Sequence, residues 1–276
     1  DDTNYTVLAL TLLEQYGKSF TRLAWADHFV RNLPPDATYT AERVAYRNLL
    51  DLRLPPASAT YRNPYRDWIG AQIRADLYGY VSPGDPLSAA HMAWTDASVT
   101  HTRNGIYGAM WVAATLAETY TYPPAQAVRR ALCVLPPRAR LTCALRDAMA
   151  DFDQGMTYEQ AAAKLRVTWE ESNQHHWCHV ISNAVIVLNA LLYGENDLGK
   201  TLSMAVLPGF DTDCNGATAG SILGLWLGSA RLPSAWKDPM RGALQVSLAG
   251  MDNPSFTALA QRTVKCVRLS PTRENE

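Results

Sequence analysis

The chain has 276 residues and a mass of 30.5 kDa, and 47% of its residues are apolar while 18% are charged. Such a chain can bury a large core, so the composition excludes an intrinsically disordered protein. The formal net charge of −1 gives no reason to expect general nucleic-acid binding or attraction to a lipid surface. The richest apolar run, 217–230, is interrupted by serines and glycines, so we expect no membrane-spanning helix.

Helical spacing of apolar residues dominates the chain. In the first segment, Tyr5, Leu8, Leu12 and Tyr16 form one stripe, and Gly17 follows as a stop signal. The same rhythm predicts further helices over 40–51, 104–120, 124–133, 138–151, 158–170, 176–193, 197–206, 216–229 and 255–268. Alternating runs typical of β-strands are not found in the sequence, which therefore predicts an all-α protein.

The predicted helices are joined by short connections marked by proline and glycine, such as Pro34-Pro35 and Ser82-Pro83-Gly84. No linker longer than about a dozen residues and no internal repeat is visible. We therefore expect one compact multi-helix domain over 1–268, followed by a polar tail over 269–276.

The cysteines form no C-x-x-C pair, and their number is odd. This spacing does not indicate a disulfide framework or a four-thiolate zinc site. We expect reduced, mostly buried thiols in a cytoplasmic protein. The cysteines are Cys133, Cys143, Cys178, Cys214 and Cys266.

Two polar segments in the first half of the chain are candidates for ligand binding. The small residues Gly70 and Ala71 could let backbone amides approach an anion, although close helix packing is an equally physical reason for them. His101, Asn104 and Tyr107 form a polar and aromatic cluster at the start of a predicted helix. An ordinary helix start remains the alternative for this cluster.

A third polar segment contains His175, Cys178 and His179, which could share one face of the helix predicted over 176–193. That face is a conceivable zinc arrangement, but no fourth ligand follows at metal spacing and the H-E-x-x-H pattern is absent. We favour an arrangement in which one of the histidines and Asn183 point into a polar cleft.

Carboxylates are concentrated in two places, and each place directly precedes a predicted helix. Asp1-Asp2 opens the chain, and Asp211-Thr212-Asp213 follows a glycine-containing turn. Neighbouring aspartates repel each other, and a hard divalent cation compensates that repulsion better than a helix N-terminus does. If the two turns met, their carboxylates would suffice for a two-metal centre with ions about 3.5–4 Å apart. Two solvated helix caps remain the alternative on spacing alone.

Glycines recur at every fourth position after the second acidic turn, at Gly216, Gly220, Gly224 and Gly228. On a helix they form one bare stripe, and each costs about 1 kcal/mol relative to alanine. We expect another backbone to pack closely against this stripe, which would hold the preceding aspartates rigidly.

Taken in order, these segments resemble the ADP-ribosylglycohydrolase family, which also includes the J1 crystallins. The resemblance covers the chain from residue 1 to about 268, and the stretch 209–213 (Gly-x-Asp-Thr-Asp) is its most specific part. The matching segments are 1–8 (DDTNYTVL), 69–76 (IGAQIRAD), 83–86 (PGDP), 96–101 (DASVTH), 177–179 (WCH) with Asn183, and 209–218 (GFDTDCNGAT).

The resemblance implies an all-α fold with two Mg²⁺ ions, or Mn²⁺, in a cleft. It implies hydrolysis of the bond between the anomeric carbon of an ADP-ribosyl group and an acceptor. The partner would be an ADP-ribosylated protein or a small molecule that contains ADP-ribose. The alternatives are a catalytically weak member that binds ADP-ribose or a related nucleotide, and a purely structural, crystallin-like protein.

The resemblance also implies roles for individual residues. Asp2, Asp211 and Asp213 would be catalytic, because the ions that they hold would orient the ribose hydroxyls and a water. The implied metal ligands are Asp1, Asp2, Asp211, Thr212, Asp213 and Cys214. The implied substrate-binding residues are Gly70, Ala71 and Gln72, in the loop that contacts the diphosphate, and His101, Asn104, Tyr107, His179 and Asn183 along the cleft.

The sequence departs from the family pattern at two points. Many members have a hydroxyl residue directly before the first aspartate pair, and an upstream helix that supplies a glutamate. Because this sequence starts at Asp1, we expect it to lack the N-terminal segment of the family. Cys214 stands where many members have a metal-binding threonine.

Overall fold

The computed structural model describes residues 2–269. The predicted ligand Asp1 and residues 270–276 of the predicted tail lie outside this range. Within it the regular structure is helical, apart from two isolated β-bridges that join Trp68 to His179 and Ala243 to Ser255. The all-α prediction is therefore confirmed. Among the described residues, no helix combines the length and the apolarity needed to cross a membrane.

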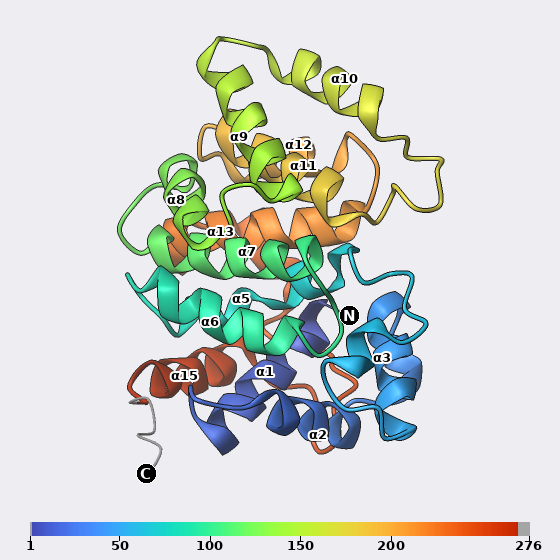
Figure 1. Ribbon diagram of the computed structural model, residues 1–276. Coiled ribbons are helices and arrows are strands. Elements are labelled where there is room, and N and C mark those ends of the chain that lie inside the picture. Colours follow the sequence, from blue (N-terminus) through green and yellow to red (C-terminus); the bar gives the residue numbers. More distant parts are fainter. Residues whose placement is uncertain (1, 270–276) are drawn as a thin grey trace.

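The order of the elements is shown in Figure 1. The α-helices are α1 (Asp2–Tyr16), α2 (Arg22–Asn32), α3 (Thr40–Leu50), α4 (Ala57–Thr60), α5 (Asp76–Tyr80), α6 (Pro86–Ala97), α7 (Asn104–Thr119), α8 (Pro124–Arg130), α9 (Arg140–Asp153), α10 (Tyr158–Thr168), α11 (Val180–Tyr193), α12 (Leu198–Val206), α13 (Thr212–Arg231), α14 (Ser234–Lys237) and α15 (Phe256–Val267). The 3-10 segments are η1 (Pro35–Ala37), η2 (Ile69–Arg74), η3 (Ala131–Val134) and η4 (Asp238–Met240).

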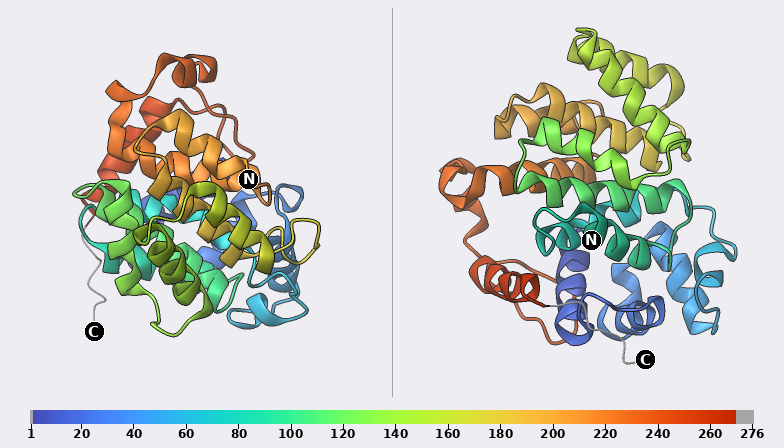
Figure 2. Two further views of the ribbon diagram at one scale, coloured as in Figure 1. Left: turned by 90° about the horizontal axis from the view of Figure 1, so that it is seen from above. Right: turned by 60° about the vertical axis from the view of Figure 1, so that its left-hand side comes forward.

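The helices form stacked layers around α7 and α11, which are buried along most of their lengths. In Figure 1, α5 and α6 lie below α7, whereas α9, α10, α11 and α12 lie above it. Helices α1, α2, α3 and α15 form the lowest layer, and α13 crosses the middle of the molecule. Figure 2 shows that the beginning of α1 lies inside this array rather than at its edge. The first acidic segment is thereby brought to the middle of the fold.

One hydrophobic cluster links the first helix to the last, from Tyr5 on α1 to Cys266 on α15. Close packing inside it depends on small residues where helices cross. Gly79 on α5 is an example, because a Cβ there would overlap the side chain of Leu116 and lie 2.7 Å from the carbonyl oxygen of Ala113. A larger residue at position 79 would therefore force α5 away from α7.

Two helices of ordinary length, α2 and α6, were not among those predicted. The buried face of α6 is built from alanines such as Ala89, Ala93 and Ala97, so the contrast in hydrophobicity between its two faces is small. Its start carries a signal all the same, because the Asp85 side chain accepts a hydrogen bond from Ser88 N at 3.0 Å and Pro86 follows.

The predicted helix over 176–193 begins only at Val180. His179 forms its N-cap, and its Nδ1 accepts a hydrogen bond from the backbone N–H of Ile181 at 3.1 Å. His175 and Cys178 therefore lie in the turns before the helix and not on it. The shared helix face that a zinc site would have needed, which we considered but did not favour, does not form.

The glycine stripe lies on α13, which starts at Thr212 and has a non-helical φ of 68° at Gly228. A Cβ on Gly216 or Gly220 would meet side chains of α12 at 3.3–3.4 Å, whereas at Gly224 it would meet nothing within 4 Å. The expected helix contact is therefore present on only part of the stripe, and it is made by side chains rather than by a backbone. Side chains of α12 pack on its first half, and its second half faces open space.

Candidate functional site

The two acidic segments meet in the folded chain. Asp2 opens α1, and Asp213 and Cys214 lie in the first turn of α13. One potential ligand atom from each of these three residues lies within 4.8 Å of the other two. The N-termini of two helices, each with unpaired backbone N–H groups, therefore meet at this cluster. Its members come from segments that lie about two hundred positions apart in the sequence.

Asn183 on α11 fixes the turn that carries the second acidic segment. Its Oδ1 accepts hydrogen bonds from the backbone N–H of Asp211 at 3.1 Å and from Asn215 Nδ2 at 2.8 Å. Its Nδ2 donates to the carbonyl oxygens of Trp177 and His179, both at 2.9 Å. The amide of Asn183 is thus fully used inside the protein, and it holds two turns of the site together.

The carboxylate of Asp211 is flanked by two buried thiols. Cys178 Sγ donates a hydrogen bond to Asp211 Oδ2 at 3.1 Å, and the Cys214 thiol lies within hydrogen-bonding reach of Asp211 and Asp2. Burial and the neighbouring carboxylates raise the pKa of both thiols. Both thiols are therefore protonated, and Cys178 donates to the Asp211 carboxylate and orients it.

The site carries more negative charge than its own residues compensate. Burial, together with the charges of Asp213 and Asp211, raises the pKa of Asp2 to about 6. Burial also raises the pKa of Asp211, although the thiol hydrogen bonds oppose the shift. The Oδ1 atom of Asp2 is buried and has no hydrogen-bond partner among the described residues. A hard divalent cation would compensate the repulsion between the buried carboxylates and would give Asp2 Oδ1 a partner. This donor set therefore fits such an ion.

The acidic cluster opens onto a cavity of about 520 Å³. Gly70, from the first of the two candidate ligand-binding segments, lines it. Trp68 and Trp177 pack edge to face on its wall, with ring centroids 6.0 Å apart. The lining residues are Tyr39, Thr40, Glu42, Trp68, Ile69, Gly70, Ile73, Trp177, Cys178, Asp211, Asp213 and Cys214.

The side chains of Ala71 and Gln72 are buried beneath this cavity and do not line it. Gln72 Oε1 lies under α7, 2.9 Å from the position that a Cβ on Gly108 would take. Among the residues singled out from the segment 70–72, Gly70 alone is in a position to meet a ligand in this cavity.

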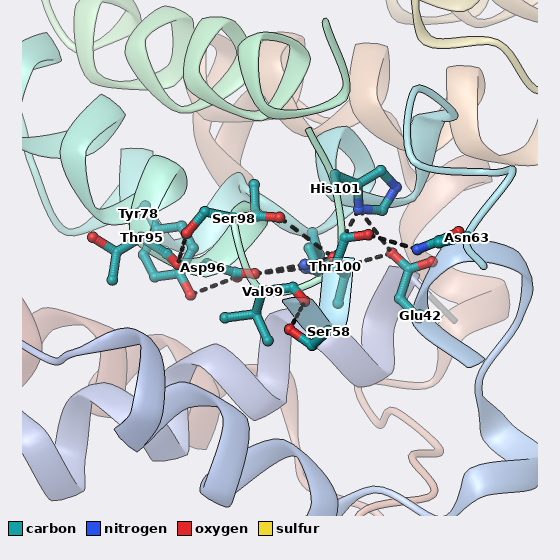
Figure 3. Close-up of polar contacts among 12 residues, drawn as sticks. Glu42, Ser58, Asn63, Tyr78, Thr95, Asp96, Ser98, Val99, Thr100 and His101 are labelled. Atoms are coloured by element: carbon teal, nitrogen blue, oxygen red, sulfur yellow. Dashed lines mark hydrogen bonds and ion pairs between the residues drawn. The ribbon is translucent and has the colours of Figure 1, made fainter. Parts of the chain in front are cut away.

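His101 is fully buried and lines neither this cavity nor the second cavity described below. Its Nδ1 lies 2.7 Å from Thr100 Oγ1 and 3.9 Å from Glu42 Oε1, and Figure 3 shows the three residues side by side. Burial lowers the pKa of His101 well below its usual value, so the ring is neutral. The ring belongs to the interior framework of the site.

Asn104 and Tyr107 line a second cavity, of about 550 Å³, at the start of α7. Three exposed arginines, Arg103, Arg138 and Arg140, lie on its wall. Asn104 Oδ1 also accepts a hydrogen bond from the backbone N–H of Leu141 at 3.2 Å, which ties the wall to α9. Asp67 also lines this cavity, so its arginines outnumber its acidic residues, and a cavity of this charge at a helix N-terminus suits an anionic group.

His179 lines neither of the two cavities. Its β-bridge to Trp68 joins the turn before α11 to the start of η2. The ring tilts against Trp169 with centroids 4.7 Å apart, and burial lowers the pKa of His179 to about 4. His179 is thus a neutral capping residue that positions the cavity wall.

Sequence reasoning missed Glu42, which lies on α3 and lines the cavity beside the acidic cluster. Its carboxylate forms an ion pair with Arg74, a buried guanidinium that is also bonded to Asp96 and Thr100. Figure 3 labels Glu42, Asp96 and Thr100, three of the residues in this network. A glutamate in the first turn of an amphipathic helix looks like ordinary capping chemistry, so the sequence alone carried no signal for it.

One comparison with known proteins identifies a family. The family model described as ADP-ribosylglycohydrolase matches residues 1–270. A solved structure titled "ADP-ribosylglycohydrolase-related protein complex" is similar to this chain, with a TM-score of 0.62 and 21% sequence identity. The match covers 97% of this chain and 79% of the solved one, and at this identity it shows the fold alone. No curated protein sequence matches the chain.

Proposed function

Because the chain belongs to the ADP-ribosylglycohydrolase family, we propose that it is a metal-dependent hydrolase that acts on ADP-ribosyl groups. The bond cleaved joins the anomeric carbon of ADP-ribose to an acceptor, which is a protein side chain or a small molecule derived from NAD. The observation that carries this proposal is the approach of Asp2 to Asp213 and Cys214 across the middle of the fold.

In this proposal two Mg²⁺ ions, or Mn²⁺, are held by Asp2, Asp211 and Asp213, with Asp1 and Thr212 as further oxygen donors. Bound there, the ions would supply Lewis-acid chemistry that orients ribose hydroxyls and lowers the pKa of a water. Cys214 does not need to be a ligand, because a protonated thiol is a poor partner for Mg²⁺. Its position beside Asp211 and Asp2 suits a donor that aims their carboxylates.

The remaining parts of the substrate would occupy the two cavities. The ribose end belongs beside Gly70 and the acidic cluster. The second cavity offers positive charge for the diphosphate from Arg103, Arg138 and Arg140, and Tyr107 offers an aromatic face for the base. A cytoplasmic location is part of the proposal, because Cys178 and Cys214 act at this site as thiols.

The test is a release assay on arginine- and serine-linked ADP-ribosyl peptides, with Mg²⁺ or with a chelator. We expect turnover with Mg²⁺, and a loss of at least about 10²-fold in Asp213→Asn with the helical circular-dichroism spectrum unchanged. Asp36→Asn, which changes an exposed aspartate on η1, is the matched control and should keep full activity. Binding of ADP-ribose without turnover would identify the weak binder instead, and equal activity in both variants would refute the proposal.

A further inference from the structure

We propose that Glu42 is a catalytic residue of this site, and that its carboxylate takes the proton of the water that attacks the anomeric carbon. The proposal rests on the proposed hydrolysis and adds a residue that neither the family resemblance nor the sequence motifs assign.

The first argument is position. Glu42 lies in the first turn of α3, is 3% exposed, and lines the same cavity as Asp211 and Asp213. A Cβ on Gly70 would overlap its carboxylate. The carboxylate therefore lies directly against the backbone of η2 at the cavity wall, in a space that exists because residue 70 is glycine.

The second argument is how firmly the carboxylate is held. Arg74 Nη1 donates to Glu42 Oε1, and Arg74 is itself fixed by Asp96 Oδ1 at 2.8 Å and Thr100 Oγ1 at 2.7 Å. The hydroxyl of Tyr78 donates to the other oxygen of Asp96 at 2.7 Å. Among the described side chains no donor is bonded to Glu42 Oε2. The network therefore orients the group, together with a backbone N–H at Glu42 that also hydrogen-bonds the carboxylate, and Oε2 keeps lone-pair capacity for a ligand or a water.

The third argument is that the carboxylates of the cavity suit different roles. The acidic residues that line this cavity are Glu42, Asp211 and Asp213. Asp213 belongs to the candidate metal cluster, and Asp211 opens the same turn and receives the Cys178 thiol. A carboxylate bound to a cation has its lone pairs occupied and its pKa lowered, so it is a poor base. Glu42 lies outside the cluster and is free for proton transfer.

The fourth argument is the charge of the surroundings. Arg74 faces two carboxyl groups, those of Glu42 and Asp96. Burial raises the pKa of Glu42, and Arg74 opposes the shift. Tyr5 on α1 also faces Glu42, and burial keeps its pKa well above the usual value.

The remaining titratable neighbours of Glu42 are uncharged as well. His101 is a neutral ring, because burial lowers its pKa, and burial raises the pKa of the Cys178 thiol. Arg74 is thus the one cation in contact with Glu42 among the described residues. Burial thus raises the pKa of Glu42 against the opposing effect of Arg74, and a carboxyl group whose pKa is shifted in this direction suits a general base.

In the proposed step the water oxygen forms a bond to the anomeric carbon while the bond from that carbon to the acceptor breaks. The electron pair of the broken bond leaves with the acceptor, which takes a proton from solvent. The proton of the water passes to Glu42 Oε2 and then to bulk water, so atoms and charge balance.

The test compares Glu42→Gln with Asp96→Asn. Both variants change a partner of Arg74, but only Glu42 lines the cavity. We expect kcat to fall by about 10²–10⁴-fold in Glu42→Gln, with the Kd of ADP-ribose and the affinity for Mn²⁺ changed less than about threefold. Asp96→Asn should lose less than about tenfold in kcat, because it affects the base only through Arg74.

Chemical rescue separates a base from a structural residue. In Glu42→Ala, added azide should restore product formation and yield ADP-ribosyl azide, because azide attacks without first losing a proton. Asp96→Asn should form no azide product. If Glu42→Gln does not fold, Glu42→Asp keeps the charge opposite Arg74, and its kcat should still fall at least about tenfold because the oxygen moves by one methylene.

Two results would overturn the assignment. One is a kcat within threefold of the wild type in a folded Glu42→Gln variant, and the other is equal azide rescue in Asp96→Asn. A wild type that releases no ADP-ribose from any substrate would refute the proposed function itself, and that result is visible before any variant is made.

Discussion

Replacing Arg74 by methionine tests whether the polar network under the cavity holds the site in place. Arg74 is 1% exposed and lies between the buried carboxylates of Glu42 and Asp96. Methionine keeps most of the apolar stem but removes the guanidinium. Two buried carboxylates then lose their common cation, together with the hydrogen bond that Thr100 Oγ1 receives.

The expected loss is large because the partners stay buried. Removing one member of a buried ion pair costs about 3–5 kcal/mol, against a total unfolding free energy of about 5–15 kcal/mol for a typical domain. Burial already raises the pKa of Glu42 and Asp96, and losing Arg74 raises both further. The folded variant then binds protons more tightly than the unfolded chain. Its unfolding free energy should therefore recover as pH falls through these raised values.

Urea unfolding of Arg74→Met and wild type at pH 5, 6.5 and 8 measures this directly. The difference in unfolding free energy should be largest at pH 8 and smallest at pH 5. Arg31→Met is the matched control, because the side chains of Arg31 and its partner Asp27 are 73% and 47% exposed; it should cost less than about 1 kcal/mol at every pH. A cost below 1 kcal/mol for Arg74→Met, or one that does not shrink in acid, would refute the reasoning.

Three further variants test other parts of the fold. Burial raises the pKa of Asp76 to about 8, so the folded carboxyl stays protonated where the unfolded one ionises, and stability falls as pH rises from about 4 to 8. Asp76→Asn should flatten this slope and gain on the order of 2 kcal/mol at pH 8. An unchanged slope in thermal melts would contradict this prediction. Gly79→Ala places a Cβ against Leu116 and should cost about 1–3 kcal/mol in chemical unfolding; no loss would mean that α5 and α7 are not in close contact. Lys18 Nζ donates to the carbonyl oxygen of Val267 at 3.0 Å, so Lys18→Met should speed amide hydrogen exchange in α15 but not in α11. The same exchange rates in α15 of the variant and the wild type would show that this hydrogen bond does not hold α15 in place.

The acidic segments and the helical class could be predicted because both depend on residues that are close together in the sequence. Apolar spacing indicates helices such as α1 and α13, and paired aspartates before a helix indicate an uncompensated charge. The sequence could also place Asp2 and Asp213 in one cluster, but only through the resemblance, because no local pattern reports a contact across about two hundred positions.

The role of buried polar residues could not be predicted, because it depends on where a side chain points. Gln72 and His101 lie in motifs of the resemblance, and the fold turns both away from the cavities. Asn183 was expected in a cleft, and its amide instead joins two turns of the site. Glu42 and Arg74 meet from α3 and η2, a pairing that neither segment signals by itself.

Anomalous diffraction from crystals soaked with Mn²⁺ and ADP-ribose is the most direct measurement of whether the start of α1 and the start of α13 hold the same cations. We expect an anomalous peak about 2.1 Å from carboxylate oxygens of both Asp2 and Asp213, with the ribose hydroxyls beside it. Peaks at other places only, or a saturated soak in which Asp2 and Asp213 have no metal density between them, would contradict the metal-dependent mechanism.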